Sequence, residues 1–239
     1  MSEERILVTS HAPRIEATED AKRHIAPGYG WASSNWSGYA LGGADGSYHS
    51  ITGDWIVPAV KRSLRPTYSA AWIGIDGFNN GNLIQAGTEQ DFLYGKARYS
   101  AWWEILPAAS ITIPEPVDAG DHMYSSIVNN NDGTWSISLE NKTKGWTFVT
   151  IQAYSGPGAS AEWIMEAPMV NSHLAKLADY GQTVFNPGTI NGGNPDLVKS
   201  DGGIMIQRRK QVSTPSYPDS DTDGFRMAYG AITPLPNRA

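Results

Sequence analysis

The stretch Ala71–Gly87 reads "AWIGIDGFNNGNLIQAG". An apolar run is followed by a segment rich in Gly and Asn, and then by a second apolar run. Gly and Asn tolerate positive φ angles, so the middle segment predicts a turn between two strands. Gln85 interrupts the second run. A buried amide without a partner costs about 1–3 kcal/mol, so Gln85 is expected to be exposed, to be paired, or to serve a purpose.

Similar strand signals recur along the chain between clusters of Gly, Asn, Asp and Pro. The expected strands are residues 48–57, 68–76, 82–89, 97–105, 122–129, 134–140, 146–153, 161–166, 203–206 and 225–230. Asp132 followed by Gly133 predicts a type I′ hairpin turn. One helix is expected from Ser172 to Gly181, because Leu174 and Leu177 are three residues apart and Gly181 can end a helix. These patterns predict an all-β fold, an antiparallel two-sheet β-sandwich or jelly roll with one short helix.

The composition supports a single globular domain. The 239 residues include 9 Trp, 11 Tyr and 25 Gly, with only 18% charged residues, which is typical of a sheet protein with many turns. Residues 1–30 are polar and are expected to form a tail or short pro-segment, and residues 31–239 the sandwich domain. The net charge of −6 disfavours nucleic acid and anionic membranes as partners. No run approaches the roughly 20 apolar residues of a membrane span.

Two further observations bear on location and chemistry. The sequence contains no Cys, which excludes a disulfide framework and a thiol nucleophile. Its first 24 residues are charged throughout and lack the apolar region of a secretory signal. A cytosolic location and export by another route both stay open.

Parity sorts the side chains of the expected strands, because successive residues point to opposite faces. On four strands one face carries a carboxylate together with Trp, Gln or a second carboxylate, and neither Lys nor Arg stands at those positions. The residues that share this face within a strand are Trp72 with Asp76, Gln85 with Glu89, Trp102 with Glu104, and Glu162 with Glu166. Such a face is either the solvated side of an antiparallel sheet or a binding cleft. Clustered carboxylates raise one another's pKa, which acid–base sites use.

The sequence motifs also bear on three other kinds of site: a serine nucleophile, a zinc site and a calcium site. No G-x-S-x-G nucleophile motif occurs. The five histidines (His11, His24, His49, His122 and His173) show no zinc spacing, and each is expected at the surface or in a turn. In "DSDTDG", the residues Asp219, Asp221 and Asp223 resemble the start of a calcium loop. Gly230 stands where that loop needs a bidentate Glu, so a structural calcium site and a simple acidic turn both stay open.

The blocks of this chain resemble those of the eqolisins, the glutamic peptidases, from about residue 34 to residue 230. "SSNWSGY", with Trp36, resembles the amino-terminal signature of the family, and "AWIGIDG", with Trp72 and Asp76, its first core motif. "LIQAG" is similar to the block with the catalytic glutamine, and "AWWE" to the block that follows it. "AEWIME" is similar to the block with the catalytic glutamate. Carried over, the catalytic dyad is Gln85 and Glu166.

The resemblance implies a lectin-like sandwich with the dyad on its concave face. It also implies a secreted, monomeric, acid-active endopeptidase that is insensitive to pepstatin, cleaves polypeptides and needs no cofactor. Glu166 would act as general base and then as acid, and Gln85 would stabilise the oxyanion. The residues expected to line the substrate site are Trp36, Trp72, Asp76, Glu89, Trp102, Glu104 and Glu162. Fungal members commonly carry disulfides, a signal peptide and an acidic residue in place of Ser100, so the chain is more similar to a bacterial branch.

Two other functions fit a sandwich of this kind. A glycoside hydrolase could use Glu162 and Glu166, but four residues at ~3.3 Å per residue separate them by roughly 13 Å along the strand. Glycosidase pairs are about 5–9.5 Å apart. A carbohydrate-binding module could use the Trp residues, but it leaves Gln85 without a role.

Overall fold

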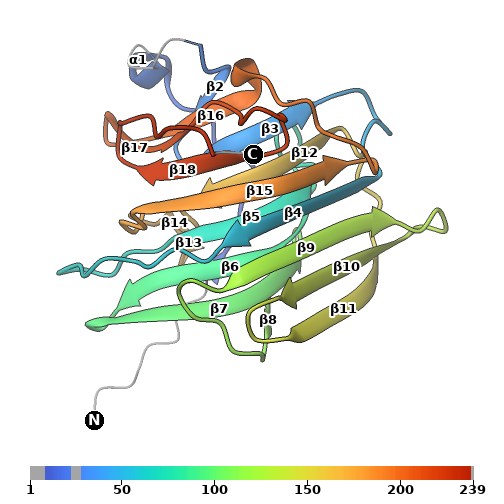
Figure 1. Cartoon of the computed structure of the whole chain (residues 1–239), viewed down its shortest axis with the longest axis horizontal. Coiled ribbons are helices and arrows are strands. Elements are labelled where there is room, and N and C mark those ends of the chain that lie inside the picture. Colours follow the sequence, from blue (N-terminus) through green and yellow to red (C-terminus); the bar gives the residue numbers. More distant parts are fainter. Residues whose placement is uncertain (1–8, 23–27, 238–239) are drawn as a thin grey trace.

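The computed structural model describes residues 9–22 and 28–237, and it is almost entirely β (Figure 1). A 15-stranded, mainly antiparallel sheet folds back on itself to give two packed layers. A separate sheet contains β1 (Thr9–Ser10), β13 (Met169–Val170) and β14 (His173–Leu174). The helical segments are the four-residue α1 (Glu19–Lys22) and the 3-10 turn η1 (Lys199–Asp201). The predicted β-sandwich class is confirmed.

The first layer contains seven strands. In spatial order it contains β11 (Trp146–Ala153), β10 (Thr134–Asn141), β9 (His122–Asn129), β4 (Ser50–Ile56), β15 (Gln182–Ile190), β18 (Phe225–Tyr229) and β17 (Lys210–Pro215). In Figure 1 this layer lies in front of β5, β6 and β12.

The second layer carries the blocks singled out in the sequence. In spatial order it contains β16 (Gly202–Gln207), β3 (Trp36–Gly42), β12 (Ser160–Glu166), β5 (Ala70–Ile75), β6 (Ile84–Leu93), β7 (Lys96–Ile105) and β8 (Ile111–Ile113). In addition, β2 (Trp31–Ser33) pairs in parallel with β16. The hairpin between β16 and β17 connects the two layers.

The second layer is buried on both faces, which explains its apolar runs. Toward the first layer, Ile73 and Trp163 pack in a core with Trp55 and Met123. The other face carries a second cluster that contains six aromatic or large aliphatic side chains: Trp31, Trp36, Trp72, Leu83, Trp102 and Ile164. Every residue of β5 and β12 is buried. A strand buried on both sides needs apolar residues at consecutive positions.

The predicted helix from Ser172 to Gly181 is wrong. Asn171 and Ser172 have positive φ angles of 49° and 63° and form a turn that leads into β14. The backbone beyond it bonds to Tyr68: the Tyr68 N–H donates to Lys176, and Ala178 donates to the Tyr68 carbonyl. The apolar side chains in this segment therefore anchor an extended chain to the core, where tertiary hydrogen bonds replace helical ones.

All ten predicted strands exist with small shifts of their ends, but several further strands were not predicted. The longest of these is β15, which contains Pro187 and shifts register between Phe185 and Gly188. Pro lacks an N–H donor, so the sequence pattern argued against a strand there. The predicted hairpin at Asp132 joins β9 to β10, but the positive φ angles fall on Asn131 and Gly133, so the turn is not type I′. No helix among the described residues is long and apolar enough to cross a membrane.

Candidate active site

Antiparallel pairing aligns the predicted residues of β12, β5, β6 and β7 in three rows across the second layer. Residues paired in this way point to the same face of a sheet. The first row contains Glu162, Gly74, Gln85 and Glu104, the second Ile164, Trp72, Gly87 and Trp102, and the third Glu166, Ala70, Glu89 and Ser100. The polar residues grouped by parity thus lie on one face, away from the main core.

Gly87 allows the middle row to form an aromatic floor. A Cβ atom at this position would lie 2.4 Å from the Cβ of Trp72 and 2.3 Å from the Ala71 carbonyl oxygen. These distances leave no room for any side chain. Trp72 and Trp102 therefore flank a bare backbone position, between the row that carries Gln85 and the row that carries Glu166.

Gln85 is completely buried, and its amide is held by its neighbour on β7. The Gln85 Nε2 donates a 2.7 Å hydrogen bond to Glu104 Oε2. The Gln85 Oε1 atom is buried and has no partner among the described residues. Only one of the two amide N–H bonds is used by Glu104, so the other can serve a ligand.

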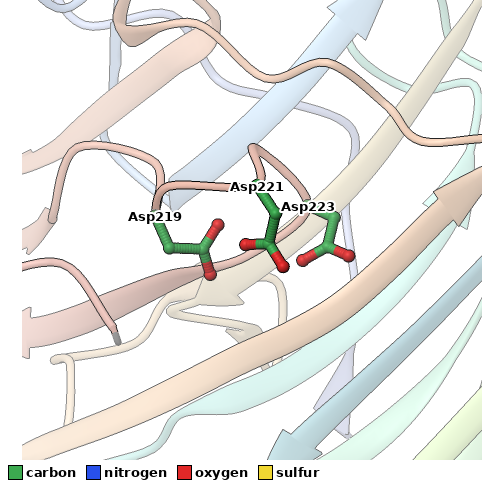
Figure 2. A group of neighbouring side chains, drawn as sticks. All are labelled: Asp219, Asp221 and Asp223. Carbon is green, nitrogen blue, oxygen red and sulfur yellow. The ribbon is translucent and has the colours of Figure 1, made fainter. Parts of the chain in front are cut away.

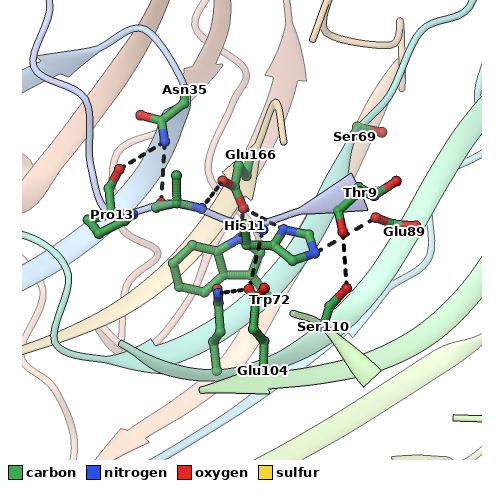
Figure 3. A network of polar contacts seen from close by, with 12 residues as sticks. Thr9, His11, Pro13, Asn35, Ser69, Trp72, Glu89, Glu104, Ser110 and Glu166 are labelled. Atoms are coloured by element: carbon green, nitrogen blue, oxygen red, sulfur yellow. Dashed lines mark hydrogen bonds and ion pairs between the residues drawn. The ribbon is translucent and has the colours of Figure 1, made fainter. Parts of the chain in front are cut away.

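Glu166 stands at the β12 end of the third row and receives three hydrogen bonds (Figure 3). Trp72 Nε1 donates to Glu166 Oε2 over 2.9 Å, and the same oxygen lies 2.8 Å from Nδ1 of His11. The Ala12 N–H donates to Glu166 Oε1 over 3.2 Å. Two of the three contacts come from the N-terminal segment, and both carboxylate oxygens are occupied.

His11 spans the space between the Gln85 row and the Glu166 row. Its ring stacks on Trp102 with a centroid distance of 3.6 Å, and its backbone N–H donates to Glu104 Oε2 over 3.2 Å. Its Nε2 lies 3.8 Å from Glu89 Oε1. The expectation that His11 is a surface or turn histidine is wrong, because only 2% of the residue is exposed.

The carboxylates of this face are shifted by their surroundings. Burial raises the pKa of Glu104 to about 7, against the opposing effect of His11. Burial likewise raises the pKa of Glu89, and Glu166 adds to that rise. Burial alone lowers the pKa of His11, but Glu166, Glu104 and Glu89 together raise it above its usual value. The face therefore combines an imidazole whose pKa is raised with two acids, Glu104 and Glu89, whose pKa values are also raised, and such perturbed groups are typical of acid–base sites.

Comparison with known families identifies this site. The profile described as the peptidase A4 family matches residues 34–224, which includes all three rows. The chain belongs to the peptidase A4 family. It is therefore a peptidase of the glutamic, or eqolisin, type, and its substrates are polypeptides. This assignment favours peptide hydrolysis over the two carbohydrate-directed alternatives. Comparison with curated protein sequences found no match.

Solved structures of A4 peptidases share the fold. Scytalido-glutamic peptidase, bound to a transition-state analog inhibitor, is 23% identical with a TM-score of 0.68, and the match covers 82% of this chain and 98% of that chain. SCP-B, an eqolisin in complex with the tripeptide Ala-Ile-His, is 24% identical with a TM-score of 0.64 and the same coverage. Aspergilloglutamic peptidase from Aspergillus niger is 22% identical with a TM-score of 0.58, over 68% of this chain and 99% of that chain.

Asp76 does not lie with the other predicted site residues of this A4 peptidase. It follows the last residue of β5 and has a φ of 71°, so the alternation of the strand ends before it. Its carboxylate accepts hydrogen bonds from Tyr154, Gly158 and Ala159, at 2.7–2.9 Å, and from Asn80. Asp76 thus holds the loop before β12, and the prediction that it contacts substrate is not supported.

Glu162 lies in the Gln85 row but is sealed from the groove. It is completely buried, and burial raises its pKa well above the usual value. No ion pair to Glu162 is found among the residues described. Burial of this kind favours the protonated form of the carboxyl group. Trp36 pairs with Glu166 across β3 and β12, so it lies on the same face, and its ring packs edge-on against Trp72 with 4.9 Å between ring centroids.

Two separate hollows adjoin the N-terminal segment. Beyond Thr9 a hollow of about 550 Å³ is lined by Glu89, Asp91 and Arg98. At the other end a hollow of about 400 Å³ is lined by Arg14, Trp31 and Phe78.

The predicted calcium ligands are brought together in a turn far from the dyad in sequence (Figure 2). One carboxylate oxygen from each of Asp219, Asp221 and Asp223 lies within 4.8 Å of the others. Only 5% of Asp219 is exposed, and no hydrogen bond to its Oδ2 is found among the residues that the structure describes. Burial, with help from the two other acids, raises the pKa of Asp219 to about 6.

Sequence reasoning missed two residues of the site, His11 and Asn35. His11 belongs to a segment that was interpreted as a tail, and no motif marks it. Asn35 adjoins Trp36 within the amino-terminal signature, so its place in that block was a usable signal. Its side chain is completely buried and binds the segment from both its oxygen and its nitrogen.

Proposed function

We propose that Gln85 and Glu166 form the catalytic dyad of an acid-active endopeptidase. One observation carries this assignment: a polypeptide segment lies over the face that the two residues share and contacts Glu166 through both a backbone N–H and a side chain. Gln85 and Glu166 lie in different rows of this face, so a substrate peptide can pass between them, as His11 does in this structure.

In the proposed reaction, ionised Glu166 takes a proton from a water molecule as the water oxygen attacks the scissile carbonyl carbon. The Nε2–H of Gln85 donates a hydrogen bond to the oxyanion that forms on the carbonyl oxygen. As the C–N bond breaks, protonated Glu166 returns the proton to the leaving nitrogen. The products are a free carboxyl terminus and a free amine, and no cofactor is required.

Two neighbours orient these groups. Trp72 donates to Glu166 Oε2 and so fixes the carboxylate against the aromatic floor. Glu104 fixes the amide of Gln85, and its pKa of about 7 keeps it protonated in acid. In that state it adds no negative charge beside Glu166, where a second anion would oppose formation of the oxyanion.

Substrate recognition in this proposal depends on backbone groups. Asn35, Ser34 and Ala32 bind main-chain atoms of the docked segment, which requires no particular side chain. We further propose a monomeric, secreted enzyme, in keeping with an acidic working environment.

We also propose that the acidic turn at Asp219 binds a structural calcium ion. Carboxylate oxygens are the ligands Ca²⁺ prefers, and three carboxylates that lie this close repel one another unless a cation or protons intervene. Buried Asp219 Oδ2 is the second observation, because it faces the cluster without a hydrogen-bond donor (Figure 2). No ion pair to the cluster is found in the described part of the chain.

The dyad is tested with Gln85→Ala and Glu166→Gln, assayed on acid-denatured haemoglobin. Loss of one oxyanion donor typically lowers kcat by about 10²–10³-fold, and loss of the base should lower it at least as far. Gln152→Ala and Glu140→Gln make the same chemical changes on β11 and β10 and should retain activity. Circular dichroism of each variant separates loss of catalysis from loss of fold. Near-normal turnover of folded Gln85→Ala would refute the assignment.

A further inference from the structure

A third hollow lies between the β16–β17 hairpin and the chain formed by β14 and the residues after it. Its volume is about 370 Å³, and pockets that bind small molecules usually have volumes of about 300–1,000 Å³. Its apolar walls are formed by Leu174, Leu177, Ile206, Val212 and Tyr229. None of the residues that line it belongs to the three rows of the candidate active site. The hollow is therefore free to serve a purpose other than peptide hydrolysis.

Gln207 connects the two sides of this hollow. From β16, its Nε2 donates to the Ala175 carbonyl over 3.0 Å and to the Ser34 carbonyl over 3.4 Å. Its Oε1 accepts a 3.3 Å hydrogen bond from the Leu177 N–H. These bonds fix the hairpin to the chain after β14, so the hollow exists before any ligand enters it. A preformed pocket loses less free energy to ordering when it binds a ligand.

Three cationic side chains also line the hollow and form its cationic rim: Lys176, Arg208 and Lys210. All three residues are exposed, no Asp or Glu is among the lining residues, and no ion pair of the rim is found in the described part of the chain. Burial and Asp179 raise the pKa of Tyr229, but Asp179 is itself paired with Lys61 over 3.2 Å. In a chain with a net charge of −6, the rim is a local excess of positive charge beside an apolar cavity.

The backbone at the tip of the hairpin is strained. Gln207 pairs with Lys210, so Arg208 and Arg209 form a two-residue loop, with φ angles of 49° and 62°. Asn and Gly are favoured in this left-handed conformation, whereas it is costly for most other residues. Arg209 forms an exposed ion pair with Asp20 over 3.2 Å, but Arg208 lines the hollow and has no partner among the described residues. Strained residues of this kind are common at ligand sites.

We propose that this hollow binds a small amphiphile with one anionic head, a carboxylate or a phosphate, and one short alkyl chain. The head contacts the cationic rim, and the chain lies against the apolar walls. The Arg208 guanidinium carries a planar set of donors that matches the oxygens of either head. An acidic peptide fits less well, because it can neutralise the rim but leaves the apolar walls in contact with water. The site does not depend on whether Gln85 and Glu166 form the catalytic dyad.

Titration calorimetry of the whole chain at neutral pH tests the role of the head. The probes are octanoate, octyl phosphate, octanol and octylammonium, each below the concentration at which it forms micelles. We expect both anions to bind, and octanol and octylammonium to bind at least about tenfold more weakly, because only the anions accept charge-assisted hydrogen bonds from the rim. The anion that binds more tightly identifies the head group. Equal affinity for octanol and octyl phosphate, or no binding of either anion, would overturn the proposal.

Chain length tests the role of the apolar walls. Each methylene group that enters the hollow should tighten binding about fourfold, so affinity should rise stepwise from butyl to octyl phosphate. Inorganic phosphate and a short polyglutamate peptide, which bring charge without an alkyl chain, should bind more weakly than octyl phosphate. If either of them binds as tightly as octyl phosphate, the rim attracts anions in general and the assignment of an amphiphile is wrong.

Arg208→Asn and Arg209→Asn form a matched pair of variants in the same loop. Both introduce a residue that is favoured at positive φ, and the exposed ion pair of Arg209 with Asp20 contributes little, so both should raise the melting temperature. Only Arg208 lines the hollow, so only Arg208→Asn should weaken the binding of octyl phosphate, by about tenfold. Equal affinity of the two variants for octyl phosphate would refute the role of Arg208 and with it the position of the site.

Discussion

Gln85 and Glu104 face each other across β6 and β7 and are joined by a 2.7 Å hydrogen bond from amide to carboxyl. The bond connects the residue that we assign to the oxyanion with an acid whose pKa burial raises to about 7. The orientation of the amide and the charge of the site therefore depend on the same pair.

Glu104→Ala should lower kcat at acid pH by about tenfold or more, because the Gln85 amide loses the partner that orients it. Glu104→Gln replaces a protonated acid by a neutral group of the same shape, so it should recover most of that activity in acid. If Glu104 has only a packing role, both variants will lose stability while kcat in acid stays unchanged. The pH–rate profiles of both variants, measured with their melting temperatures, provide the comparison.

The pH optimum should lie in mild acid, roughly pH 3–5 from the reference values of carboxyl groups. The rate should fall toward neutrality, because Glu166 must carry a proton to the leaving group and because Glu104 loses its proton near pH 7. At the acid end, 18 Lys+Arg and 5 His repel one another once the carboxylates are neutral, so unfolding should precede loss of chemistry. A pH–rate profile recorded beside circular dichroism checks both limits. An optimum above pH 7 would contradict the glutamate-base mechanism.

Glu162→Gln should make the protein more stable at neutral pH without improving it in acid. The raised pKa means that folded Glu162 keeps a proton that the unfolded chain releases above its ordinary value. The contribution is therefore fully present below about pH 4.3 and declines by about 1.4 kcal/mol per pH unit above it, until the raised pKa is reached. Gln cannot ionise and has no such slope. Chemical denaturation of both proteins at pH 4 and pH 7 measures the difference, and parallel pH dependence of the two would show that Glu162 is not neutral in the fold.

Calcium should raise the melting temperature if the acidic turn binds it. A ligand at 100 times its Kd stabilises the folded state by about 2.7 kcal/mol. Asp221→Asn should reduce the response, whereas Asp45→Asn, which alters an exposed acid elsewhere, should not. Identical melts with calcium and with chelator would remove this site.

The sequence by itself predicted β5, β6, β7, β12 and β16 of the second layer and, within each of the first four, which polar residues share a face. A strand has a period of two residues, so parity alone assigns each side chain to a face once the strand exists. Its blocks also identified the family. The pattern misled at Asp76, where a positive φ ends the alternation, and at residues 172–181, where bonds to Tyr68 replace helical ones.

Only the tertiary structure decided what lies over that face. Residues 9–17 are polar and aperiodic, and local sequence carries no signal for backbone contacts with β13, Asn35 and Ala32, which are distant in the chain. The raised pKa of His11 depends on carboxylates from three other strands, and the raised pKa of Glu162 depends on its burial by the surrounding fold. Burial and charge are sums over neighbours in space, so the protonation of this site belongs to the fold and cannot be read from any single block of residues.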